Sequence, residues 1–100
     1  MVRHVIVWTL KDEYDDSEKD VIRAGIKEGL EGLKGKIPGL VEINVYTEGL
    51  PGSNGDAMLD SLFENEDALK NYSSDPAHVE VATTKVRPFV KMRSCFDYEC

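Results

Sequence analysis

Hydrophobic and polar side chains alternate along residues 2–10, the pattern of a β-strand. One face carries His4, Ile6, Trp8 and Leu10, and the other carries Arg3, Val5, Val7 and Thr9. Similar alternation predicts further strands at residues 40–48, 56–63 and 91–98. Both faces of the first strand are largely apolar, so we expect both to be covered. Helices of the same chain can cover one face of a sheet, and the other face then needs a partner.

Helical patterns separate these strands. A first helix is predicted over residues 15–34, because Asp15, Asp16 and Ser17 supply capping groups and negative charge at its start. Apolar residues at helical spacing form one stripe that we expect to pack on the sheet, namely Val21, Ile22, Ile26, Leu30 and Leu33. A second helix is predicted over residues 65–72. A further helical piece starts at Pro76, a favoured first-turn residue, with Asp75 as its cap.

The resulting order, β-α-β-β-α-β with the last α split in two, predicts a ferredoxin-like α+β fold. In this fold, a four-stranded antiparallel sheet carries its helices on one face. The other face is expected to be bare and to carry Val5, Val7, Val41, Ile43 and Val45. Two such faces packed together make a dimeric α+β barrel, so we predict a homodimer.

Size and charge narrow the class of protein. The 100 residues predict a single domain spanning 1–100, and the net charge of -7 argues against a nucleic-acid partner. No apolar run approaches membrane-spanning length, and the first residues read as a strand and not as a signal peptide, so we expect a cytoplasmic protein without a membrane partner. Cys95 and Cys100 lack the spacing of a metal site, and in an extended segment they would point apart. We therefore predict no metal and no cofactor.

The segment 72–79 carries the most informative chemistry. Tyr72 and His78 lie six positions apart on either side of Pro76, and both side chains can exchange a proton or donate a hydrogen bond. Structural alternatives stay open for both residues. His78 would hydrogen-bond a backbone carbonyl, and Tyr72 would lie at the edge of the core with its hydroxyl in water.

Three other residues of the strands have structural interpretations. His4 would be a buried neutral histidine with one hydrogen bond, and Trp8 would be core or pocket wall. Asp60 stands in an apolar strand, on the same face as Met58 and Leu62. A lone carboxylate there is expected to pair across the dimer or with Arg93.

Five landmarks in order resemble the Dabb family, the stress-responsive dimeric α/β-barrel proteins. They are the opening strand, the Lys-Ile-Pro-Gly-Leu turn at 36–40, Asp-Pro-Ala-His-Val at 75–79, Arg-Pro-Phe-Val at 87–90 and Phe-Asp-Tyr at 96–98. The resemblance implies a dimeric α+β barrel, in agreement with the periodicity of the strands.

Within that family the pocket motif is similar to that of the plant olivetolic acid cyclase. This similarity implies catalytic roles for His78 as general base and for Tyr72 as donor to a developing oxyanion. It also implies a substrate-binding pocket lined by His4, Ile6, Trp8, Ile26 and Leu30. The chain departs from the pattern at Asp75, which replaces the usual first histidine of His-Pro-x-His. Ile26 and Leu30 are aliphatic where the cyclase has aromatic side chains.

Three functions follow from these patterns. The favoured interpretation is a stress-responsive dimeric barrel, without an assigned reaction, whose pocket takes a small apolar or keto ligand. The first alternative is a cofactor-independent acid–base enzyme, a polyketide cyclase-like aldol lyase or cyclase that uses His78 and Tyr72. The second alternative, a cofactor-free monooxygenase, rests on fold analogy alone.

Overall fold

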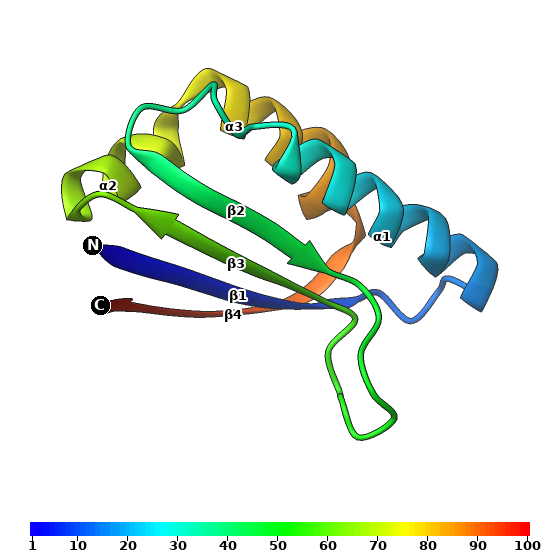
Figure 1. The fold of residues 1–100 in the computed structure, drawn as a ribbon. Helices are drawn as coiled ribbons and strands as arrows, with labels where there is room; N and C mark the ends of the chain where they lie inside the picture. The colour runs from blue at the N-terminus through cyan, green and yellow to red at the C-terminus, as the bar shows by residue number, and fades with distance from the viewer.

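The computed structural model describes residues 1–100 and has one sheet with its helices on one face (Figure 1). The elements in chain order are β1 (Val2–Leu10), α1 (Asp16–Glu31), β2 (Leu40–Tyr46), β3 (Ala57–Phe63), α2 (Glu66–Ser74), α3 (Pro76–Val81), a π-helical turn η1 (Ala82–Val86), a 3-10 turn η2 (Arg87–Phe89) and β4 (Val90–Glu99). The four strands are antiparallel in the order β2-β3-β1-β4, which confirms the predicted ferredoxin-like α+β fold. The two termini lie side by side, and the Met1 amino group donates to the Cys100 carbonyl at 3.3 Å.

Helix α1 begins and packs as its sequence predicts, with two corrections. The Asp15 side chain accepts a hydrogen bond from the Glu18 backbone N–H at 2.8 Å, and the Glu18 side chain caps in return. The helix ends at Glu31 and not near residue 34, because the chain turns at Gly32 and reaches a left-handed conformation at Gly35, with φ of 83°. Val21 does not belong to the buried stripe, since its side chain is 73% exposed. The core residues Ile22, Ile26 and Leu30 recur every four positions, and Val21 lies to one side of that row.

The helix-covered face of the sheet holds the main core. His4, Ile6, Trp8 and Leu10 of β1 are buried there, as their alternation predicts. The prediction that Ile43 and Val45 lie on the bare face is wrong, because both are buried on the helix-covered side. The strand register explains the error. Ile43 pairs with Ser61 and Val45 with Leu59, and those two residues pair with His4 and Ile6. Alternation shows which residues share a face but not which face is covered.

The opposite face of the sheet is not covered by any helix (Figure 1). It carries four large side chains that are at least 43% exposed, namely Tyr46, Met92, Phe96 and Tyr98. Asp60 lies on this face and accepts a hydrogen bond from the Arg3 guanidinium at 2.9 Å. Its predicted pairing with Arg93 is wrong, because Arg93 pairs with Trp8 in the β1–β4 register and so lies on the other face.

Candidate functional site

A cavity of about 540 Å³ lies between the helices and the sheet. Such a volume is typical of sites for small organic molecules. Its wall combines residues of β1 (His4, Ile6, Trp8), of the α2–α3 segment (Tyr72, Ser73, His78), of η1 and η2 (Ala82, Val86, Arg87) and of β4 (Val90, Lys91, Arg93) with Leu30 and Leu59. Segments from both ends and the middle of the chain therefore meet at one site.

The break between α2 and α3 brings the tyrosine and the histidine together. Asp75 ends α2 and begins α3, and its side chain accepts a hydrogen bond from the Ala77 backbone N–H at 2.9 Å. Pro76 then occupies the first turn of α3, where its missing N–H costs nothing. Tyr72 lies on the last turn of α2 and His78 on the first turn of α3. Their ring centroids are 4.0 Å apart.

Tyr72 does not lie at the edge of the core with its hydroxyl in water, because its side chain is only 2% exposed. The ring packs against Phe63 at a centroid distance of 5.0 Å and against the edge of His4 at 6.2 Å. Its hydroxyl is buried and has no hydrogen-bond partner. Burial raises the pKa of Tyr72 well above its ordinary value, and the charge of Arg93 offsets part of that rise. The phenol therefore stays protonated at neutral pH and can act as a hydrogen-bond donor.

His78 is partly buried, and its Nδ1 atom also lacks a hydrogen-bond partner. Burial lowers the pKa of His78. A hydrogen bond with the Ser73 backbone opposes this decrease, and the charge of Arg87 adds to it. The imidazole is therefore neutral at pH 7, the protonation state that a general base needs.

The lowered pKa of His78 gives a direct prediction. The chain has only two histidines, so their Cε1–H signals can be followed by proton NMR during a pH titration and assigned with a His78→Gln variant. We expect the His78 midpoint to fall below its ordinary value of 6.5. The unfolded chain then binds more protons than the native one in the window between that midpoint and 6.5, so stability rises with pH across this window. A midpoint at or above 6.5 would contradict the burial described here.

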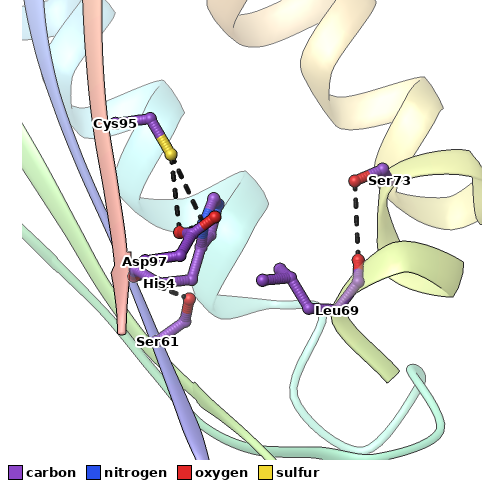
Figure 2. A network of polar contacts seen from close by, with 6 residues as sticks. All are labelled: His4, Ser61, Leu69, Ser73, Cys95 and Asp97. Atoms are coloured by element: carbon purple, nitrogen blue, oxygen red, sulfur yellow. Dashed lines mark hydrogen bonds and ion pairs between the residues drawn. The ribbon is translucent and has the colours of Figure 1, made fainter. Parts of the chain in front are cut away.

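His4 forms a second polar group with residues of β4. Figure 2 shows His4, Cys95 and Asp97 pointing toward one another, with the His4 Nδ1 atom 2.5 Å from the Asp97 Oδ1 atom. The Cys95 Sγ atom lies 3.8 Å from the same nitrogen and 3.4 Å from the same oxygen. A neutral His4 that donates from Nδ1 to Asp97 keeps its Nε2 atom as an acceptor. Ser61 supports this strand by donating to the His4 carbonyl at 3.1 Å (Figure 2).

The same three side chains, His4, Cys95 and Asp97, are of the kinds that bind metal ions, and the fold brings them together. Their donor atoms lie within 4.8 Å of one another, and imidazole, thiolate and carboxylate are all ligands of zinc. Burial, followed by hydrogen bonding and repulsion from Asp97, raises the pKa of the Cys95 thiol. Because zinc binds the thiolate, this arrangement suits a hydrogen-bonded network better than a metal centre. Local spacing could not reveal the group, since its members come from opposite ends of the chain.

The structure places most of the predicted site residues at the cavity. Tyr72, His78 and four of the five predicted pocket residues line it, namely His4, Ile6, Trp8 and Leu30. Ile26 is fully buried in the core and is not part of the wall. Sequence reasoning missed Arg87, Arg93 and Asp97. The alternation of β4 would have placed Arg93 and Asp97 on one face, but only the pairing with β1 shows that this face meets the cavity.

The fold and the cavity define a ferredoxin-like protein with a pocket the size of a small molecule. A model of the stress responsive A/B barrel domain, Dabb, matches residues 2–100, and the chain belongs to this family. None of its helices combines the length and apolarity needed to cross a membrane. No curated protein matches the sequence significantly.

Solved structures share this fold. A dimeric protein of unknown function from Bacteroides fragilis, with a ferredoxin-like fold, is 32% identical and has a TM-score of 0.92 over 99% of this chain and 95% of that one. A Dabb protein from Mesorhizobium loti is 20% identical, with a TM-score of 0.75 over 99% and 95%. The hydroxynitrile lyase of Passiflora edulis is also 20% identical, with a TM-score of 0.71 over 97% and 90%. The last two show the likeness of the fold alone. The narrower similarity to the olivetolic acid cyclase stays a prediction.

Proposed function

We propose that the cavity binds a small carbonyl compound and that His78 and Tyr72 catalyse proton removal from the carbon beside its carbonyl group. One observation carries this proposal. The Tyr72 hydroxyl and the His78 Nδ1 atom are the two buried side-chain polar atoms without a hydrogen-bond partner, and they belong to adjacent rings at the cavity. Buried polar groups are nearly always satisfied, so an unsatisfied pair beside a cavity favours a ligand that supplies the partners.

The chemistry of the two residues is complementary. His78 is neutral at pH 7 and takes the proton, while the electron pair of the broken C–H bond forms a C=C bond and the π pair of the carbonyl moves onto its oxygen. The Tyr72 hydroxyl, kept protonated by its burial, donates a hydrogen bond to that oxygen as its negative charge develops. The resulting enolate could then attack a second carbonyl, as an aldol closure requires. The competing function, a barrel that binds the compound without converting it, uses the same cavity.

Hydrogen–deuterium exchange distinguishes catalysis from binding. We expect the protein to accelerate the loss of the C-2 methylene signal of a β-keto ester, ethyl 3-oxohexanoate, in deuterated buffer by about a hundredfold or more over buffer alone. The two histidine signals report binding in the same sample. Exchange at the buffer rate, with the His78 signal shifted by the compound, would contradict the catalytic function and leave a binding protein.

We also propose that the chain forms a homodimer through the uncovered face of the sheet. The exposed side chains of Tyr46, Met92, Phe96 and Tyr98 are an apolar surface of the kind that soluble monomers rarely keep. The Bacteroides fragilis relative, at 32% identity, is a dimeric protein. Packing two such sheets face to face would remove both surfaces from water.

Sedimentation equilibrium tests this assembly. We expect wild-type protein to sediment at twice the 11.2 kDa mass of the chain, and Phe96→Asp to sediment as a monomer, because the substitution places a charge in the proposed interface. Val21→Asp is the matched control, since Val21 is 73% exposed on α1, away from this face. A folded wild-type monomer at micromolar concentration would refute the homodimer, and so would a Phe96→Asp protein that stays dimeric.

A further inference from the structure

The charges around the cavity differ from those of the chain as a whole. The chain has 12 lysines and arginines against 19 acidic residues. The wall of the cavity carries Arg87, Lys91 and Arg93 but no aspartate or glutamate. An acidic protein therefore presents a cavity wall whose charged side chains are all cations.

The two arginines also have no carboxylate partner within the chain. Arg3 is paired with Asp60, and Arg23 with Asp20 and Asp56. Lys91 is held by Asp12 at 3.0 Å. Arg87 and Arg93, in contrast, form no ion pair within the chain, although it has an excess of carboxylates. The two arginines of the cavity are thus the unpaired ones among the four of the chain.

Their positions bring them close to the proposed acid–base pair. Arg93 pairs with Trp8 in the β1–β4 register and so lies on the helix-covered face, where its charge acts on the Tyr72 hydroxyl. Arg87 follows directly after η1, and its charge acts on His78. A planar guanidinium binds a carboxylate through two parallel hydrogen bonds, which a lysine ammonium cannot reproduce.

We infer that the cavity is selective for an organic anion, a carbonyl compound that carries a carboxylate held by Arg93 and Arg87. The apolar part of this compound would lie against Ile6, Trp8, Leu30 and Val86. This inference rests on the proposed function, because it names the class of compound that reaches Tyr72 and His78. Guanidinium groups also bind phosphate, but the largely aliphatic and aromatic wall favours an amphiphilic carboxylate.

A matched pair of probes tests the selectivity. We would titrate the protein with 4-phenylbutanoate and with 4-phenylbutanamide, which differ in charge but hardly in shape, and follow the Cε1–H signals of the two histidines. We expect the acid to bind about tenfold more tightly than the amide at low salt, and Arg93→Gln to abolish this preference by weakening the binding of the acid far more than that of the amide. Lys34→Gln removes the same charge at an exposed site that is not part of the wall and should keep the preference. Inorganic phosphate should compete only weakly.

Each outcome decides between the two proposals. Equal binding of acid and amide, or equal loss with Arg93→Gln and Lys34→Gln, overturns the anion selectivity even when the β-keto ester still exchanges its protons. A preference for the acid without accelerated exchange supports the anion site and overturns the reaction. Strong competition by inorganic phosphate assigns the arginines to a phosphate compound and overturns the carboxylate. If neither probe shifts a histidine signal at millimolar concentration, the anion selectivity fails, and the proposed reaction is then decided by the exchange of the β-keto ester alone.

Discussion

Replacing Tyr72 with phenylalanine should stabilise the protein and, in the same variant, slow the exchange of the β-keto ester. The Tyr72 hydroxyl is buried without a hydrogen-bond partner, and such a group costs about 1–3 kcal/mol. Its removal leaves the ring packed against Phe63 and His4, so we expect the free energy of unfolding to rise by about 1 kcal/mol. The exchange rate should fall by about a hundredfold, because the oxygen that gains charge loses its donor.

Urea denaturation and the exchange assay check both halves of this prediction. Tyr14→Phe is the control, because Tyr14 packs on Phe89 outside the cavity and should change neither quantity by a comparable amount. A Tyr72→Phe protein of lower stability would show that the hydroxyl has a partner in the folded state. A more stable variant with unchanged exchange would make Tyr72 a packing residue only.

This opposition between stability and activity follows from the way the polar groups around the cavity are arranged. The His4 ring is held by Asp97, and its backbone carbonyl by Ser61. The Tyr72 hydroxyl and the His78 Nδ1 atom have no such partner. Natural proteins keep unsatisfied polar groups mainly where a function requires them. The polar groups of His4 have partners, whereas the Tyr72 hydroxyl and the His78 Nδ1 atom have none. This contrast is an argument for a ligand at Tyr72 and His78.

Local sequence patterns predicted where the helices and strands lie along the chain better than they predicted how these elements contact one another. The alternation of β1 correctly grouped His4, Ile6 and Trp8 on one face, since a period of two is a property of the strand alone. The same alternation failed for Ile43 and Val45, because the covered face of β2 depends on its register with β3. Such a register belongs to the sheet and not to any one segment.

The candidate site shows the same limit. Tyr72 and His78 could be predicted because a short break at Asp75 and Pro76 relates them within a few residues of the chain. Arg93 and Asp97 reach the site through pairing between the first and the last strand, which the local sequence does not encode. Leu30 lines the cavity whereas Ile26, one helical turn earlier, does not. A helical stripe predicts burial, but it does not tell whether a buried side chain meets the sheet or a cavity.

His78→Ala should reduce the exchange of the β-keto ester to the buffer rate, a loss of about a hundredfold or more, with little change in stability. The imidazole is the group that takes the proton, and its Nδ1 atom anchors nothing in the fold. The expected change in the free energy of unfolding is about 1 kcal/mol or less, because the half-buried imidazole gives up only its hydrogen bond with the Ser73 backbone. Urea denaturation of the variant measures this change.

Two further measurements separate a base from a packing residue. Free imidazole added to His78→Ala should restore part of the exchange, because the vacated space lies at the cavity wall and the added base can enter it. The wild-type rate should rise with pH through the lowered pKa of His78 and then level off, and the variant should lose this step. His4→Ala, unlike His78→Ala, should lower the stability of the protein, because it leaves Asp97 without its hydrogen-bond partner. If His78→Ala instead unfolds the chain, or keeps the wild-type exchange rate, His78 is not the base, and the cavity is a binding site without the proposed proton transfer.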